Sequence, residues 1–219
     1  ILARRVRSTQ RQVAWCVPRC RVGSDWASSM STHHLIVGGQ RSGKSRHAER
    51  LAQQWLNEGR DREVVVLATA LAGDAEMRSR IERHRLDRPV VFATVEVPMA
   101  LGTAVRQHAA SHRLLLIDCL TLWLTNVCMP HEAAAQASSQ AWPGLKADFL
   151  HSLDHARSLG SSVVAISNEV GWGVVPMGRE VREFVDELGR LNQDVALACD
   201  TLTLMVAGQA WTRPVEPRL

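Results

Sequence analysis

The fold class of this 219-residue chain is decided by Leu35-Ile36-Val37-Gly38-Gly39-Gln40-Arg41-Ser42-Gly43-Lys44-Ser45. Three apolar residues typical of a strand lead into a complete G-x-x-x-x-G-K-S pattern, and a segment with helical spacing follows. Glycines let the backbone curl so that successive N–H groups face a phosphate, and the next helix adds its positive end. We therefore expect a phosphate-binding loop, with Lys44 reaching the β- and γ-phosphates of a nucleotide and the Ser45 hydroxyl binding Mg²⁺.

A glycine-rich turn that matches this pattern by chance is the alternative interpretation. Only two of the 26 basic residues are lysines, Lys44 and Lys146. A lysine at the decisive position is therefore unexpected in so arginine-rich a chain. Nucleotide binding is the favoured interpretation.

Beyond the loop, short β-branched runs alternate with longer stretches of helical period. These runs predict strands at Leu35–Gly38, Val64–Thr69, Val90–Val95, Leu114–Asp118, Val163–Ser167 and Leu202–Val206. The longer stretches predict helices at about 44–58, 74–86, 99–111, 144–159 and 179–199. Parallel strands need crossover connections, which helices supply. The prediction is an α/β fold of the P-loop NTPase type, with three layers and a mostly parallel central sheet.

Two segments leave alternatives open. Pro130–Gly144 is rich in Ala, Ser and Gln, and is either a helix with a flexible entrance or a surface excursion. Gln209–Leu219 contains two prolines and is either an edge strand or a tail. Neither segment is long enough to separate domains, and one domain over residues 30–219 is expected.

The net charge of +4 first suggests an anionic partner such as a nucleic acid. Residues 1–29, however, hold six arginines against a single acid, whereas the rest holds 20 basic and 21 acidic side chains. The body is therefore not basic, and no nucleic-acid partner is predicted. We expect residues 1–29 to be a basic extension without a role in the fold, with Met30 as the natural start; a transit-like peptide is the alternative.

Cysteine usage and hydropathy bear on the compartment. The five cysteines lack the C-x-x-C spacing of a metal site, and their odd number argues against a disulfide framework. The longest apolar stretch, Leu114–Leu124, is interrupted by Asp118 and falls short of the roughly 20 residues of a membrane span. A cytoplasmic protein without a membrane span is predicted.

Asp118 is a candidate partner of the phosphate loop. It follows four apolar residues, Leu114–Ile117, as a carboxylate at the end of a predicted strand. Such a carboxylate completes the surroundings of Mg²⁺ in nucleotide-binding loops of this type. An aspartate that caps the helix Cys119–Val127 is the alternative, and both roles are compatible.

Other sequence features narrow the class of nucleotide-binding protein. The chain has no N-K-x-D pattern and no D-x-x-G after the acidic strand, which argues against a regulatory GTPase. It is also too short for a large motor or transporter ATPase. A small-molecule kinase or a nucleotidyltransferase fits the length.

A histidine amid arginines is the next candidate. In the predicted helix 74–86, Met77, Ile81 and His84 share one face, and such a histidine is most often a core residue. Its surroundings change this interpretation, because arginines stand at positions 80, 83, 85 and 88. The cluster suits a polyphosphate.

Four motifs together resemble a known family. They are Gly38-Gly39-x-Arg41-Ser42-Gly43-Lys44-Ser45-Arg46, Ala68-Thr69-Ala70, Arg80-Ile81-x-x-His84-x-x-x-Arg88-Pro89 and Asn168-Glu169-Val170-Gly171-x-Gly173-x-Val175-Pro176. With them, the sequence from about 34 to 208 resembles the bifunctional adenosylcobinamide kinase / adenosylcobinamide-phosphate guanylyltransferase family. The loop motif is generic, whereas the histidine motif and the last motif are specific to this family.

The resemblance implies two reactions in cobalamin biosynthesis. A nucleoside triphosphate, ATP or GTP, phosphorylates adenosylcobinamide, and GTP then donates GMP to adenosylcobinamide phosphate, giving adenosylcobinamide-GDP and pyrophosphate. It also implies Mg²⁺ and a homo-oligomer. The alternatives are an enzyme with the guanylyltransferase activity only, and a non-catalytic nucleotide-dependent binding protein.

The resemblance further implies which residues act. His84 is expected to carry GMP covalently, with Lys44 as a second catalytic residue, and Ser45 and Asp118 are expected at the metal. The expected nucleotide-binding residues are Gly38, Gly39, Gln40, Arg41, Ser42, Gly43, Lys44, Ser45, Ala68, Thr69, Ala70, Arg85, Leu86, Asp87, Arg88, Glu96 and Asp118. For Glu96, a surface carboxylate at a strand end is the alternative.

Overall fold

A computed structural model describes residues 32–73, 75, 78, 79, 82, 83, 88–129 and 135–216, and of residues 135–140 it describes the backbone only. Its strands are β1 (His33–Gly38), β2 (Glu63–Ala68), β3 (Ala93–Glu96), β4 (Arg113–Asp118), β5 (Ser162–Ile166), β6 (Thr201–Val206) and β7 (Gln209–Pro214). Its helices are α1 (Lys44–Asn57), α3 (Leu101–His108), α4 (Leu120–Cys128), α5 (Ala135–Ser158) and α6 (Arg179–Leu197). The predicted basic extension, residues 1–29, lies outside the described residues.

The strands form one sheet in the order β3-β2-β4-β5-β1-β6-β7. All neighbours are parallel except β6 and β7, which pair antiparallel at one edge. The mostly parallel sheet that the sequence predicts is therefore confirmed. Of the two alternatives for Gln209–Leu219, the edge strand is correct over its first six residues.

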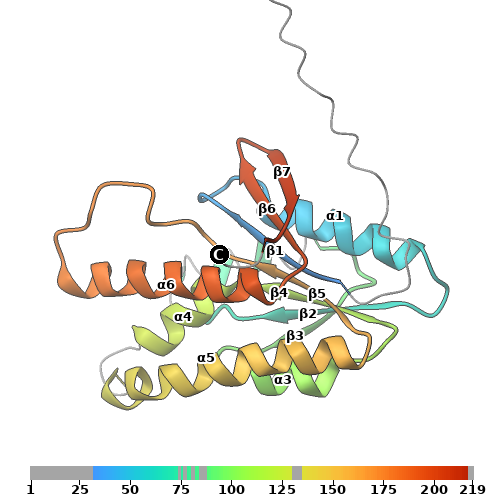
Figure 1. Cartoon of the computed structure of the whole chain (residues 1–219), viewed down its shortest axis with the longest axis horizontal. Coiled ribbons are helices and arrows are strands. Elements are labelled where there is room, and N and C mark those ends of the chain that lie inside the picture. Colours follow the sequence, from blue (N-terminus) through green and yellow to red (C-terminus); the bar gives the residue numbers. More distant parts are fainter. Residues whose placement is uncertain are drawn as a thin grey trace, which may run out of the picture.

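Helices cover both faces of the sheet (Figure 1). On one face, α3, α4, α5 and α6 pack their apolar side chains on strand residues such as Leu35 and Ile117. On the other face, α1 packs Ala48, Ala52 and Trp55 on residues that include Ile36. The predicted three-layer arrangement is confirmed, with two apolar clusters separated by the sheet.

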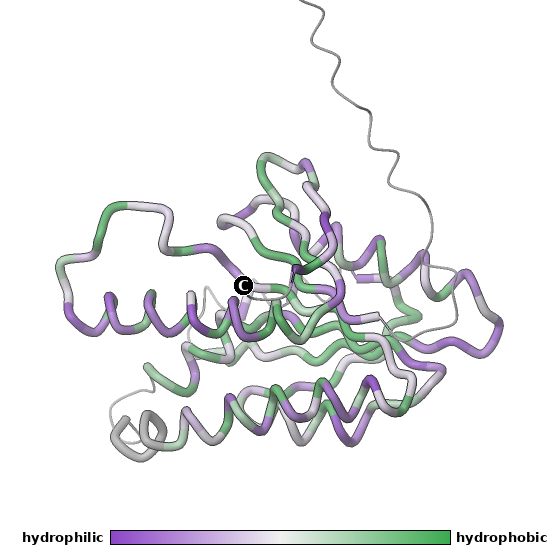
Figure 2. The backbone as a smooth tube through the Cα atoms, in the orientation of Figure 1, coloured by the Kyte–Doolittle hydropathy of each residue, from purple (hydrophilic) through white to green (hydrophobic). Residues whose placement is uncertain are grey.

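Strand composition explains why the central strands are covered on both sides. All six residues of β1 and all five of β5 are buried, as expected for parallel strands between two helical layers. Figure 2 shows hydrophobic colour along the central strands and alternating colours along the helices that cover them. Each helix thus presents one apolar stripe to the sheet and a polar side to the surroundings.

Several predicted boundaries are wrong. The strand predicted at Val90–Val95 begins at Ala93, because Val90 and Val91 lie exposed in a turn after Pro89. The helix predicted at 144–159 extends back to Ala135 and contains Pro143, so the surface-excursion alternative is wrong for residues 135–144. The helix predicted at 99–111 is shorter, and the helix predicted at 74–86 falls largely outside the described residues.

The cysteines in the described part of the chain are Cys119, Cys128 and Cys199, and none of these three forms a disulfide. Burial raises the pKa of the Cys119 and Cys128 thiols to about 11. A thiol in such surroundings stays protonated and is a poor nucleophile or metal ligand. Within the described part of the chain, these two thiols are therefore poor candidates for catalysis.

Candidate functional site

The loop between β1 and α1 carries the phosphate-binding pattern. Gly43 precedes the helix with a φ of 96°, a left-handed conformation that glycine adopts without strain. The Ser42 N–H donates to the Gly39 carbonyl at 3.3 Å, and the His47 N–H donates to the Gly43 carbonyl at 3.0 Å. The first N–H groups of α1 have no partner within the helix, so this end of the helix favours an anion.

Two neighbouring segments fasten this loop. The Gly38 carbonyl accepts a hydrogen bond from the Glu169 N–H at 3.1 Å, and the Ser42 carbonyl accepts one from the Gly208 N–H at 3.0 Å. A Cβ atom on Gly38 would lie 2.3 Å from the carbonyl oxygen of Met205 on β6. The loop is therefore held between the ends of β5 and β6, and its first glycine permits that close approach.

Lys44 lies folded over the loop. Its Nζ donates to the carbonyls of Gly38 at 2.9 Å and Gly39 at 2.6 Å, and the residue is only 8% exposed. Burial lowers the pKa of Lys44, while the nearby Cys119 and Asp118 oppose that effect. The ammonium is thus pre-placed at the loop, within a partly desolvated environment where its charge acts strongly on a phosphate.

A cleft of about 1250 Å³ opens at the carboxyl ends of the strands, beside this loop. This volume exceeds the roughly 300–1,000 Å³ usual for a site that takes one small ligand. The lining residues come from the loop, from the strand ends and from the segment before β3. Among them are Gln40, Arg41, Ser42, Gly43, Lys44, Ser45, Ala68, Ala70, Arg83, Arg88, Glu96, Asp118 and Asn168.

An ion-pair cluster lies at the same cleft. The Arg88 Nη2 atom lies 2.7 Å from Asp118 Oδ2, and its Nε atom lies 3.9 Å from Glu49 Oε1 on α1. The Arg88 side chain is 9% exposed, so these charges meet in a partly desolvated place. In the sheet, Ala68 on β2 pairs with Asp118 on β4 and with Glu96 on β3. The ends of β2, β3 and β4 therefore meet at the cleft.

Comparison with known proteins assigns this arrangement to a family. The family model described as cobinamide kinase / cobinamide phosphate guanyltransferase matches residues 34–212. The chain belongs to this family. The bifunctional adenosylcobalamin biosynthesis protein CobP of Pseudomonas aeruginosa is 43% identical over 183 residues, which cover 84% of this chain and 98% of that protein. The bifunctional adenosylcobalamin biosynthesis protein CobU of Escherichia coli K12 is 36% identical over 181 residues, which cover 80% and 95%.

Membership in the cobinamide kinase / cobinamide phosphate guanyltransferase family confirms the expected enzyme class. A solved structure that is similar to this chain is that of the flagellar accessory protein FlaH from Methanocaldococcus jannaschii, with a TM-score of 0.43 and 14% identity over 83% of this chain and 75% of that chain. Among the described helices, none is both long enough and apolar enough to cross a membrane.

The family residues predicted from sequence fall into two groups within the described part of the chain. Most line the cleft, including Arg88, Glu96 and Asp118. Gly38, Gly39 and Thr69 are not among the lining residues. The Thr69 side chain is fully buried, and its hydroxyl bonds to the backbone of Cys119. Asp118 also does not cap α4 through its side chain: Cys119 stands at that position, and no side-chain capping bond is present there.

The histidine segment of the family motif is described only at its flanks. His84, Arg85, Leu86 and Asp87 lie outside the described residues. The residues on either side of them, Arg83 and Arg88, both line the cleft. Four residues therefore separate two cleft-lining arginines along the chain.

Sequence reasoning missed Glu49 and assigned no role to Asn168. Glu49 follows Ser45 by four residues on α1, so both stand on one side of the helix, and this spacing is the signal that could have found it. Asn168 lines the cleft at the end of β5, where its N–H donates to the Thr121 hydroxyl at 2.9 Å. Asn168 follows a buried strand, as Asp118 ends one, and this position could have predicted that both lie at the carboxyl ends of the strands.

The residues expected at Mg²⁺ suit that ion chemically. Ser45 and Asp118 both line the cleft and offer a hydroxyl and a carboxylate, the hard oxygen donors that Mg²⁺ prefers. The described residues contain no group of three or more His, Cys, Asp or Glu side chains that could hold a metal alone. The donor set therefore fits a Mg²⁺ that is bound chiefly through phosphate oxygens and water.

Proposed function

We propose that this protein phosphorylates adenosylcobinamide and then transfers GMP from GTP to the resulting phosphate. The observation that carries the proposal is one cleft that is lined both by the lysine and serine of a phosphate loop and by the Arg88–Asp118 pair. Its volume, about 1250 Å³, accommodates a nucleotide together with the reacting end of a second substrate. One cleft can thus serve both reactions in turn.

In the kinase step, the triphosphate lies along the loop with its terminal phosphates at Lys44. The N–H groups at the start of α1 and the Lys44 ammonium hold the charge that grows on the γ-phosphate oxygens. The hydroxyl oxygen of adenosylcobinamide attacks the γ-phosphorus and its proton passes to solvent, while a P–O bond forms and the bond to the nucleoside diphosphate breaks. Mg²⁺, held by Ser45 and Asp118, would neutralise phosphate charge during this transfer.

In the transferase step, His84 is the nucleophile. A neutral imidazole nitrogen attacks the α-phosphorus of GTP, an N–P bond forms, and pyrophosphate leaves. A phosphate oxygen of adenosylcobinamide phosphate then attacks the same phosphorus, which breaks the N–P bond and restores the histidine. Arg83 and Arg88 support this role because they flank the segment in sequence and line the cleft.

The covalent route is tested with GTP labelled at the α-phosphate. We expect label to stay on the wild-type protein through an acid-labile, base-stable bond and to be released by adenosylcobinamide phosphate. His84→Ala should abolish the label, whereas His151→Ala, at an exposed site on α5, should keep it. Absence of label on a folded wild-type protein with Mg²⁺ present would refute the histidine intermediate.

We further propose a homo-oligomer in the cytoplasm. The segment between β5 and α6 supports self-association, because Trp172, Val174, Val175 and Met177 expose between 67% and 96% of their surface. Exposed apolar groups in such a run commonly mark an interface. Sedimentation at several protein concentrations tests this, and replacing Trp172 and Val175 by serine should lower the sedimenting mass.

A further inference from the structure

Thr69 holds the peptide group that follows Asp118. Its buried hydroxyl accepts a hydrogen bond from the Cys119 N–H at 2.8 Å and donates one to the Cys119 carbonyl at 2.7 Å. The Thr69 N–H also donates to the Asp118 carbonyl at 3.1 Å. A single residue at the end of β2 therefore fixes the backbone on both sides of the Asp118–Cys119 junction.

Asn126 on α4 continues this connection to the next strand. Its Nδ2 atom donates to the Thr69 carbonyl at 2.7 Å and to the Pro98 carbonyl at 3.0 Å. The Val97 N–H also donates to the Ala68 carbonyl at 2.7 Å. Pro98 follows Glu96 by two residues, and Thr69 directly follows β2. Asn126 therefore connects the chain just after Glu96 to the chain just after β2.

We propose that Thr69 and Asn126 are positioning residues that set Asp118 and Glu96 against the phosphate loop. Neither side chain lines the cleft, whereas both carboxylates do. Within the described part of the chain, the Thr69 hydroxyl and the Asn126 amide connect the backbone at the ends of β2, β3 and β4. The Thr69 side chain thus acts on the nucleotide site through Asp118, because its hydroxyl is engaged by the Cys119 backbone.

This inference rests on the proposed function for the identity of the substrate. A purely structural role for the same hydrogen bonds is the competing explanation. The two differ in what should change: a positioning role predicts a loss of turnover and of Mg²⁺-dependent nucleotide binding, whereas a structural role predicts a loss of stability alone. A displacement of a reacting group by about 1 Å can slow a reaction by about a hundredfold.

The decisive variants are Thr69→Val, which removes the hydroxyl at nearly equal volume, and Thr69→Ser, which keeps it. Thr125→Val is the matched control, because the Thr125 hydroxyl bonds only to Thr121 of its own helix, at 2.9 Å. Asn126→Ala removes both donor bonds and is an independent probe. Each variant is assayed for guanylylation rate, for KM, and for binding of a fluorescent GTP analogue with Mg²⁺ or with a chelator.

For Thr69→Val and Asn126→Ala we expect guanylylation to slow by about ten- to a hundredfold. The Mg²⁺-dependent part of analogue binding should weaken, and binding in chelator should stay within about twofold because the loop is unchanged. Thr69→Ser and Thr125→Val should behave as wild type. Unchanged turnover in a folded Thr69→Val protein would overturn the proposal.

Two further outcomes are informative. If Thr69→Val and Asn126→Ala both fail to fold while Thr69→Ser folds, the hydrogen bonds are a folding requirement and the positioning role is wrong. If the wild type shows no guanylylation at all, the proposed function fails. The Mg²⁺ dependence of analogue binding then still tests Thr69 and Asn126, because it needs no turnover.

Discussion

Gly38 and Gly39 are adjacent in the sequence but meet different surroundings. A Cβ atom on Gly38 would lie 2.3 Å from the Met205 carbonyl oxygen, whereas a Cβ atom on Gly39 would have no neighbour within 4 Å. The two glycines therefore stand in the same motif for different reasons. The first allows the loop to approach β6, and the second leaves the side of the loop open.

This contrast gives a matched pair of variants. Gly38→Ala should lower the free energy of unfolding by about 1–3 kcal/mol, because the backbone of β6 or of the loop has to shift. It should also weaken binding of a GTP analogue. Gly39→Ala should keep the wild-type free energy of unfolding. Urea denaturation and analogue titration measure these effects, and equal losses in the two variants would contradict the packing explanation.

At the residue scale, the sequence predicted the loop and the charged groups better than the buried polar ones. Asp118 could be placed because it ends an apolar run, and strand ends of a parallel sheet meet at one edge. Glu96 was expected only from the family resemblance. Asn126 could not be found in this way. Its two acceptors are carbonyls 57 and 28 residues away in sequence, and no local pattern encodes such a pairing.

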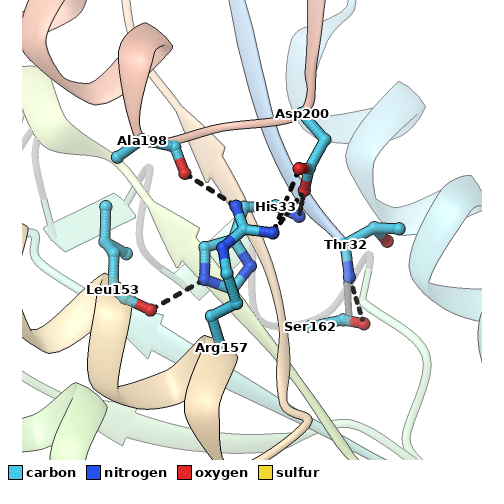
Figure 3. Close-up of polar contacts among 7 residues, drawn as sticks. All are labelled: Thr32, His33, Leu153, Arg157, Ser162, Ala198 and Asp200. Atoms are coloured by element: carbon cyan, nitrogen blue, oxygen red, sulfur yellow. Dashed lines mark hydrogen bonds and ion pairs between the residues drawn. The ribbon is translucent and has the colours of Figure 1, made fainter. Parts of the chain in front are cut away.

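Among the elements, β1 contains two adjacent buried histidines. His33 Nε2 lies 2.9 Å from the Leu153 carbonyl, and Arg157 and Asp200 form an ion pair beside it (Figure 3). His34 Nε2 lies 2.7 Å from the Thr203 hydroxyl on β6. Burial lowers the pKa of both histidines, for His34 to about 4 with a smaller contribution from His47. The native sheet therefore favours their neutral forms.

The lowered pKa of His34 predicts a pH-dependent stability. Between its ordinary value of 6.5 and about 4, the unfolded chain binds more protons than the folded chain, so the stabilisation is complete above pH 6.5 and declines toward pH 4. The loss approaches about 3 kcal/mol for this residue. Urea denaturation across this range measures it.

Glutamine variants distinguish the contribution of His34 to the pH dependence of stability from that of the other titratable groups. His34→Gln cannot take up the proton and should reduce the slope of stability against pH. His151→Gln, at an exposed position on α5, should keep the wild-type slope. Equal slopes in wild type and His34→Gln would show that other groups carry the dependence.

The errors in predicted elements have physical causes. Val90 and Val91 favour a strand by propensity, but Pro89 and the turn after it delay pairing until Ala93. In α5, Pro143 removes one backbone donor, which is insufficient to end a helix that continues on both sides. Sequence period thus located the elements, while their ends depended on tertiary contacts.

For the whole molecule, the three-layer arrangement followed from alternation of strand and helix patterns, because both faces of a parallel sheet have to be covered. The antiparallel β7 was foreseen only as one of two alternatives. Its six residues are all exposed, so no buried pattern distinguished it from a tail. The segment forms a strand because it pairs with β6, from Val206↔Gln209 to Thr201↔Pro214.

The charge distribution leads to a prediction for residues 1–29. The family match begins at residue 34, and all of the excess positive charge precedes Met30. A chain that begins at Met30 should have a lower isoelectric point, an unchanged thermal midpoint and full labelling by GTP. Loss of nucleotide binding in that shorter chain would show that the extension contributes to the site.

The direction of β1 has a practical consequence. The strand runs from His33, at the amino ends of the parallel strands, to Gly38 at the phosphate loop, a distance of about 17 Å for six residues. Thr32 therefore lies at the amino ends of the parallel strands, remote from the cleft at their carboxyl ends. A biotin or a sensor surface attached ahead of Thr32 would leave the mouth of the cleft open, so that binding of a bulky corrinoid can be followed on immobilised protein.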